Sequence, residues 1–462
     1  MHTHRVSRTT VFAGFLGLFG LLSLTGAGPT SLPAQEMDAR PVNPGRTTES
    51  PYTVNLDVTF GVTSFLSEDT GTDTYQFVAL RPGLSVGDFA IGLDLPLNYR
   101  FTGENGTKSE IREEDWVPDS DHSFLDVYLP KLRYLRYGTR GDLFHLRLGK
   151  LSGTTLGNGF VLNNYSNQLF LPDQQIVGGL VDVDGAGVGF PYLGLQTVVA
   201  DAASWNLTGG RLFVRPFSRT GISVLSARQL GVTYVMDRDP SDIATDHVVV
   251  WGVDLCQPVL DSDRLALTFL GDVAVQKSRQ GVMAGFTGRA AGILLFGGQL
   301  RIMDANFIPE YFDYSYDLRR EQRYAVYNGD FTIPGRAGWL GRLGFTLLED
   351  TFIFDTVVRG SFTPEPGSYP ELHSVLTLEE GLIPGFSAFS AQGSYTKFDI
   401  RRWNDFTDAE NAIIGVRFNI RSGQVVVSLR YDLTYDPYTA GDPTASGEPW
   451  VVTSGLESTI SF

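Results

Sequence analysis

The C-terminal segment, residues 450–462, alternates between two kinds of side chain. One face is largely apolar and has aromatic residues at both ends, whereas the other face is mostly polar or small. The first face consists of Trp450, Val452, Ser454, Leu456, Ser458, Ile460 and Phe462. A period of two residues indicates a β-strand. An apolar face that begins and ends on aromatic rings is typical of a strand that spans a membrane between its two interfaces.

The same alternation recurs in other segments of the chain. Clear examples cover residues 52–63, 89–100, 412–421 and 424–435, and charged residues occupy only one face of each. Because an arginine that faces lipid at mid-depth costs about 2–4 kcal/mol, we expect the polar faces to point toward the inside of a barrel. A soluble β-sandwich would alternate too, but its strands would rarely be this long so often.

Connections between the predicted strands differ in length. The short ones include 86–88, 138–142, 190–192, 261–263, 349–350 and 421–423, and the long ones include 102–122, 151–180, 237–246, 362–370, 399–410 and 436–449. Short turns on the periplasmic side and long loops outside are typical of outer-membrane barrels. We therefore predict an all-β fold, a transmembrane antiparallel up-and-down β-barrel of about 16–20 strands.

Residues 304–323 do not fit this count. Strands counted back from Phe462, at the periplasmic end, place most short turns inside and most long loops outside. The 304–323 segment has the aromatic and charged composition of an exposed loop, but the count places it on the periplasmic side. We therefore expect a strand to be miscounted between residues 277 and 340. A barrel of this width keeps a lumen that is filled by water or by loops.

The N-terminus predicts export. Arg5 and Arg8 precede an uncharged apolar run over residues 11–24, and small residues follow it, which is the pattern of a secretory signal peptide. The segment before the first strand is too short for a plug domain, which argues against a TonB-dependent receptor. The predicted organisation is a signal peptide over 1–34, a periplasmic N-terminal segment over 35–51 and an outer-membrane β-barrel over 52–462.

Composition argues against several other classes of protein. The chain has 52 acidic and 36 basic residues and a formal net charge of −16, which argues against binding of nucleic acid through its overall field. The mean hydropathy is −0.04, and no later stretch reaches the ~20 apolar residues of a membrane helix. Cys256 is the single cysteine, so the exported chain has no internal disulfide.

The inward faces of the predicted strands carry both signs of charge. The candidate pore-lining residues are Asp57, Asp94, Arg100, His145, Arg147, Asp272, Asp355, Arg359, Arg417, Arg430 and Asp432. Opposed arginines and aspartates can set the ion preference of a pore, or they can simply hydrate and brace its wall. Arg417 and Arg430 flank the predicted turn at 421–424, so we expect them to form a shared basic patch.

The 151–180 segment is the least strand-like long stretch and is rich in glycine and asparagine. It could fold into the barrel and narrow it, or it could be an ordinary surface loop. The candidate constriction residues are Asn158, Asn163, Asn164, Tyr165 and Asn167.

The terminal Phe462 behind a membrane-type strand resembles the C-terminal signal of Gram-negative outer-membrane barrels. The elements at 156–160 (LGNGF) and 163–167 (NNYSN) resemble uncharacterised bacterial outer-membrane proteins. The resemblance implies a place in the bacterial outer membrane, with Phe462 as the membrane-assembly signal. The expected partners are outer-membrane lipid, lipopolysaccharide, the barrel-assembly machinery and small solutes, and three copies could associate as a homotrimer. The expected function is that of a porin, which allows passive or mildly selective diffusion of small solutes.

Two other functions stay open. The long aromatic and acidic loops would also suit a non-conducting barrel that acts as a surface adhesin or structural protein. An enzyme is disfavoured, because His122, His145, His247 and His373 lie in no nucleophile motif and Gly-x-Ser-x-Gly is absent. We also expect no cofactor and no metal site, since the acidic loop over 104–122 matches no calcium-loop spacing.

Overall fold

The computed structural model describes most of the chain after the N-terminal region. The described residues are 52–67, 71–102, 108–119, 123–168, 175–241, 246–262, 264–347, 351–381, 388–408, 410–435 and 450–462. The expected signal peptide over 1–34 and the periplasmic segment over 35–51 lie outside these residues.

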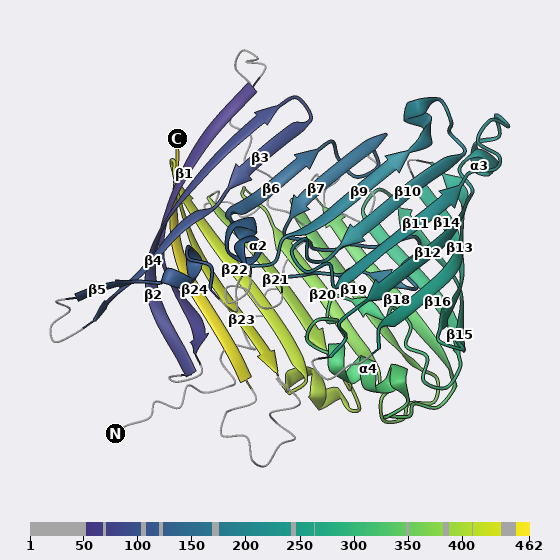
Figure 1. Cartoon of the computed structure of the whole chain (residues 1–462). Coiled ribbons are helices and arrows are strands. Elements are labelled where there is room, and N and C mark those ends of the chain that lie inside the picture. The colour runs from purple at the N-terminus through teal and green to yellow at the C-terminus, as the bar shows by residue number, and fades with distance from the viewer. Residues whose placement is uncertain are drawn as a thin grey trace.

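The chain forms one closed barrel of 20 antiparallel wall strands (Figure 1). The wall strands are β1 (Tyr52–Ser67), β2 (Gly71–Val86), β3 (Phe89–Leu93) continued by β4 (Leu95–Thr102), β6 (Leu132–Tyr137), β7 (Phe144–Gly149), β9 (Gly178–Asp184), β10 (Leu193–Val199), β11 (Leu207–Val214), β12 (Gln229–Asp237), β13 (Val248–Asp261), β14 (Leu265–Gln276), β15 (Arg279–Ala290), β16 (Leu294–Met303), β18 (Arg336–Leu347), β19 (Phe352–Ser361), β20 (Glu371–Leu378), β21 (Phe389–Lys397), β22 (Ala412–Ser422), β23 (Val425–Tyr435) and β24 (Trp450–Ser461). Strands β3 and β4 count as one because both pair with β2. Pairing of β1 with β24 closes the wall.

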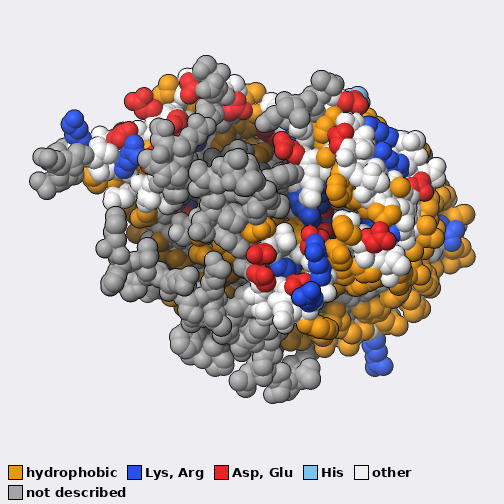
Figure 2. Space-filling view, turned by 90° about the horizontal axis from the view of Figure 1, so that it is seen from below, with side chains coloured by type: hydrophobic (Ala, Val, Ile, Leu, Met, Phe, Trp, Pro, Cys, Tyr) orange, Lys and Arg blue, Asp and Glu red, His pale blue; other side chains and the backbone are white. Residues whose placement is uncertain are grey.

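Wall side chains alternate between the outer surface and the lumen. In β13, Trp251, Val253 and Leu255 are exposed on the outside, whereas Val250 and Asp254 are buried on the inside. Figure 2 looks at the loop end and shows apolar side chains along the outer rim. A closed ladder with an apolar outer surface satisfies the wall's backbone groups without water, as a lipid environment requires.

Short turns gather at the end of the barrel that holds Phe462, which is at the top of Figure 1. Two-residue turns join β2 to β3 and β22 to β23 at this end. Gly87 and Gly423 have φ values of 56° and 61°, the left-handed backbone that such hairpins favour. The short helices α3 (Ser223–Ser226) and η5 (Gly185–Val188) also belong to connections at this end.

Most longer connections lie at the opposite end, the loop end. They contain β5 (Lys108–Ile111), η3 (Glu113–Asp115), α2 (Phe124–Tyr128), η4 (Leu129–Lys131), β8 (Leu162–Asn163), β17 (Phe312–Asp313), α4 (Arg320–Asn328) and η6 (Trp403–Thr407). No helix in the described part of the chain is long and apolar enough to cross a membrane.

The position predicted for residues 304–323 is wrong. These residues connect β16 to β18 at the loop end, not at the end that holds Phe462. The two-residue turn at 277–278 explains the miscount, because it joins β14 to β15 at the loop end, where long loops are expected. The predicted range of 16–20 strands includes the observed number.

Candidate pore and inner loops

Two connections fold into the barrel from the loop end. We call them the inner loops: residues 150–168 after β7 and residues 304–335 after β16. They meet in the lumen, where β8 of the first loop pairs in parallel with β17 of the second. Their aromatic residues pack together, with the rings of Phe160 and Phe307 stacked at 5.7 Å and those of Tyr311 and Phe312 in edge contact at 5.0 Å.

The inner loops bury an apolar part of the wall. Val248 and Val250 of β13 and Met283 of β15 belong to the same buried cluster as Phe160 and Tyr311. The expectation that inward faces are polar therefore fails on this part of the barrel, because the loops and not water cover it. We call the inward faces of β9 to β20, where the inner loops contact them, the packed side.

The tip of the first inner loop rests on the wall. Gly157 has a φ of 59°, and a Cβ there would lie 2.9 Å from both Arg211 Nε and Asp254 Oδ2, so only glycine fits. The next residue, Asn158, donates a hydrogen bond from Nδ2 to Asp272 Oδ2 at 2.8 Å. The LGNGF element thus sets the close approach of the loop to β13 and β14.

The other candidate constriction residues extend from this tip. Asn163 accepts a hydrogen bond from Thr155 within the loop, and Asn167 bonds the backbone of Leu151 and Ala200. Asn164 reaches β20, where its Nδ2 lies 3.3 Å from His373 Nε2. Tyr165 donates to Asp317 Oδ2 of the second loop at 2.9 Å. The first loop thus spans from β14 to β20 across the lumen.

Buried ion pairs hold the second inner loop to the wall. Glu310 pairs with Arg301 of β16 and Arg359 of β19. Asp313 lies 2.6 Å from Arg359 and 2.7 Å from Arg323. Burial raises the pKa of both carboxyl groups, but the facing guanidinium groups outweigh it and hold each pKa below its usual value. Both carboxylates therefore stay charged in the lumen.

A different environment surrounds the charges of β22 to β24 and β1 to β3, which we call the open side. Arg81 lies 3.0 Å from Asp94 and 3.7 Å from Glu457, and the Glu457 side chain is 39% exposed. Arg430 and Asp432 also pair, with 29% and 30% of their side chains exposed. On the packed side, Arg301 and Glu310 are each 3% exposed. Solvent can therefore reach the charges of the open side.

Arg417 and Arg430 face each other directly across β22 and β23, as the sequence predicted. Arg417 is exposed, and no carboxylate among the described residues forms an ion pair with it. Lys150, at the start of the first inner loop, is within electrostatic range of both arginines and of Arg81. This group, which we call the basic cluster, brings together residues of the wall and of an inner loop.

The predicted pore-lining residues lie in several different surroundings. Asp57, Asp94, Arg417, Arg430 and Asp432 belong to the open side, and Asp272 and Arg359 belong to the packed side. Asp355 lies on β19 and pairs with Arg342 of β18, with 29% of each side chain exposed. His145 and Arg147 are buried near the base of the first inner loop. Arg100 lies on the β4–β5 ribbon, which projects away from the barrel, where it pairs with Glu110 and Asp73 (Figure 1).

Sequence reasoning missed Arg81, Lys150 and Glu457 of the open side and Glu310 and Asp313 of the second inner loop. One signal could have indicated that loop. Residues 248–251 are apolar on both faces of the strand, a pattern that indicates cover on the lumen face as well as lipid outside.

The closed antiparallel ladder and its apolar outer surface define the chain as an outer-membrane β-barrel protein. The prediction of fold class is confirmed. The apolar outer surface of the closed barrel fits the predicted location in a bacterial outer membrane. The role of Phe462 in assembly, a homotrimer and the individual pore-lining roles stay predictions.

Known proteins give a loose likeness. No family model and no curated protein matches the chain. OccAB3 from Acinetobacter baumannii is 10% identical over 89% of this chain and 99% of its own, with a TM-score of 0.36. OpdK from Pseudomonas aeruginosa, solved with vanillate, is 11% identical over 89% and 98%, with a TM-score of 0.33. CdiB from Acinetobacter baumannii is 9% identical over 88% of this chain, which spans 60% of CdiB, with a TM-score of 0.25. The class assignment rests on the ladder and the apolar surface of this chain.

Proposed function

We propose that the barrel is a pore through which small solutes diffuse passively across the outer membrane. The observation that carries the proposal is the open side, where inward-facing charges such as Arg417, Arg430 and Glu457 keep contact with solvent. Charges that only braced a closed interior would be as buried as Arg301 and Glu310. The path therefore runs along the open side.

The inner loops form the opposite boundary of this path. They occupy the lumen next to β9 to β20 and leave the charged faces of β22 to β24 and β1 to β3 in contact with solvent. The gradient of the solute provides the driving force, and the lining charges set the selectivity. Because no carboxylate among the described residues pairs with Arg417, and Lys150 adds a second positive charge within its electrostatic range, small anions are favoured over cations of the same size.

The test is the conductance of the refolded mature protein in a planar lipid bilayer. Reproducible current steps are expected, with a reversal potential in a KCl gradient that shows preference for chloride. Folding is checked beforehand by the heat-dependent shift of the band on an SDS gel. Folded protein that gives no steps would overturn the pore, and a non-conducting adhesin or structural barrel would take its place. Steps with preference for potassium would overturn only the anion preference.

A further inference from the structure

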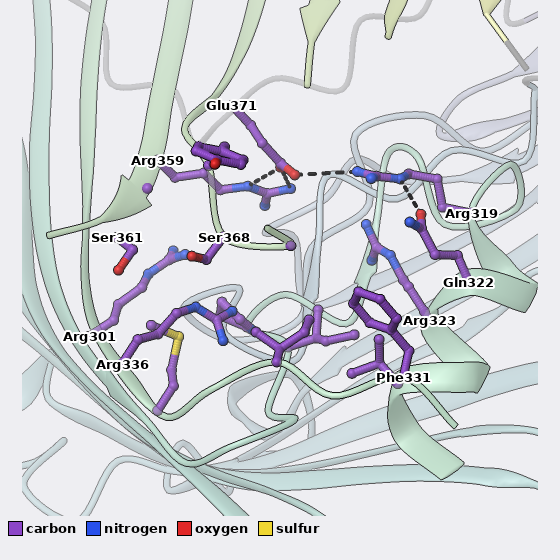
Figure 3. Close-up of a pocket in the computed structure, with 18 of the residues that line it drawn as sticks. Arg301, Arg319, Gln322, Arg323, Phe331, Arg336, Arg359, Ser361, Ser368 and Glu371 are labelled. Atoms are coloured by element: carbon purple, nitrogen blue, oxygen red, sulfur yellow. Dashed lines mark hydrogen bonds and ion pairs between the residues drawn. The ribbon is translucent and has the colours of Figure 1, made fainter. Parts of the chain in front are cut away.

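A pocket lies between the second inner loop and the wall strands β16, β18 and β19 (Figure 3). In the figure, Arg301 and Arg336 enter it from the wall, and Arg319 and Arg323 enter it from the loop and α4. Arg359 and Glu371 lie along one edge. This pocket is separate from the open side. The packing of the inner loops does not require an empty space here, and neither does the diffusion of solutes along the open side.

The pocket has an excess of positive charge. Five arginines line it, and the carboxylates that pair with them in the described structure are Glu310, Asp313 and Glu371. Five guanidinium groups thus face three carboxylates, and two positive charges have no counterpart. An uncompensated guanidinium that is partly withdrawn from water favours an anion from solution.

Arg336 is the arginine that is least engaged. Its one hydrogen bond within the described residues is a 3.5 Å contact from Nη1 to the carbonyl oxygen of Pro334. By contrast, Arg301, Arg319, Arg323 and Arg359 each bind at least one carboxylate. The planar fork of Arg336 is therefore free to bind both oxygens of a carboxylate.

Apolar and aromatic side chains line another part of the pocket. Its lining includes Met303, Ile308, Val326, Phe331, Ile333 and Trp339. Ser361 and Ser368 also line the pocket (Figure 3). An apolar surface beside a free guanidinium suits a ligand that joins a hydrocarbon body to one acidic group, because inorganic anions would leave the apolar surface without a partner.

We propose that this pocket binds a small amphipathic carboxylate, whose carboxyl group pairs with Arg336 and whose apolar body lies against Phe331, Ile333 and Trp339. The site would hold such a solute at the loop end, either before the solute passes through the barrel or without any such passage. The proposal does not rest on the pore, because binding here requires no open path through the barrel.

The experiment is calorimetric titration of the folded barrel in detergent, without current measurement. Phenylacetate is the probe, and phenylacetamide is its neutral match. The wild-type protein is expected to bind phenylacetate and to bind phenylacetamide at least about tenfold more weakly, the effect of one charge-assisted hydrogen bond. Equal affinity for the two compounds, or no heat from phenylacetate up to millimolar concentration, would overturn the proposal.

Variants locate the site. Arg336→Gln should weaken phenylacetate binding by roughly tenfold, whereas Arg238→Gln, which changes an exposed arginine after β12, should leave it unchanged. Phe331 is 48% exposed, so Phe331→Glu is a second variant with little risk to folding. It places a carboxylate in the pocket that Arg336 also lines and should compete with the ligand. Unchanged affinity in both pocket variants would place the binding elsewhere and refute the assignment.

Discussion

The two sides of the lumen contain the same residue types in different surroundings. On the packed side, Arg301 and Glu310 pair with only 3% of each side chain exposed. On the open side, Arg81 and Glu457 lie 3.7 Å apart with 18% and 39% exposed. Removing one partner of an ion pair that is shielded from water lowers stability strongly, because the other charge is left buried and unpaired. A solvated ion pair contributes little to stability. Burial, and not residue type, thus separates charges that hold the inner loops from charges that a solute can meet.

The largest effect should come from breaking the packed side. Glu310→Gln leaves Arg301 and Arg359 without one of their carboxylates, and removal of one partner of a buried pair costs about 3–5 kcal/mol. We expect faster hydrogen exchange in residues 304–335 and larger, noisier current steps. The matched change on the open side, Glu457→Gln, should cost less than about 1 kcal/mol. Equal effects of the two variants would contradict the distinction between the sides.

A pH dependence of intermediate size should come from Asp317 of the second inner loop. Burial raises its pKa to about 6, in spite of the hydrogen bond from Tyr165. The carboxyl group of Asp317 binds a proton more tightly in the docked loop than in the undocked loop. Docking is therefore favoured at low pH and weakens as the pH rises from about 4 to about 6. The rise of this pKa from 3.8 to about 6 corresponds to about 3 kcal/mol. Hydrogen exchange of the loop at pH 4 and pH 7, corrected for the intrinsic pH dependence of exchange, measures most of this loss.

Asp317→Asn is the control for that dependence. The variant has no charge to bury, so its loop exchange should change little across the same pH range. Glu310 and Asp313 should give a pH dependence of the opposite sign. Their pKa values are lowered, so the ion pairs through which they stabilise the docked loop are lost only as the pH falls below the usual range of a carboxyl group. A pH dependence that persists in Asp317→Asn would assign it to another group.

The smallest effect on stability, and a clear one on selectivity, should follow from Arg417→Gln. The side chain is exposed and faces the like charge of Arg430, so its removal should change stability by about 0.5 kcal/mol or less. The reversal potential in a KCl gradient should shift toward weaker preference for chloride. An unchanged reversal potential would show that the basic cluster does not face the conducting path.

The alternation of apolar and polar residues was sufficient to predict the strands of the wall. It did not predict the inner loops that fill part of the barrel. Alternation indicated the strands at 412–421 and 424–435, and the short turn between them correctly placed Arg417 beside Arg430. The second inner loop depends on contacts between Glu310 and arginines of β16 and β19, which no local spacing reveals. The inward valines of β13 broke the expected polar face for the same reason, because the cover comes from distant parts of the chain.

The parallel pairing of β8 with β17 also constrains the order of assembly. Leu162 and Phe312 are partners in this pairing, but all of β9 to β16 lies between them along the chain. Contacts of such long sequence separation form late, after the intervening strands have been placed. We therefore expect a growing barrel to pass through a stage with a wide interior and uncovered aromatic rings. That surface stays uncovered until the two inner loops meet.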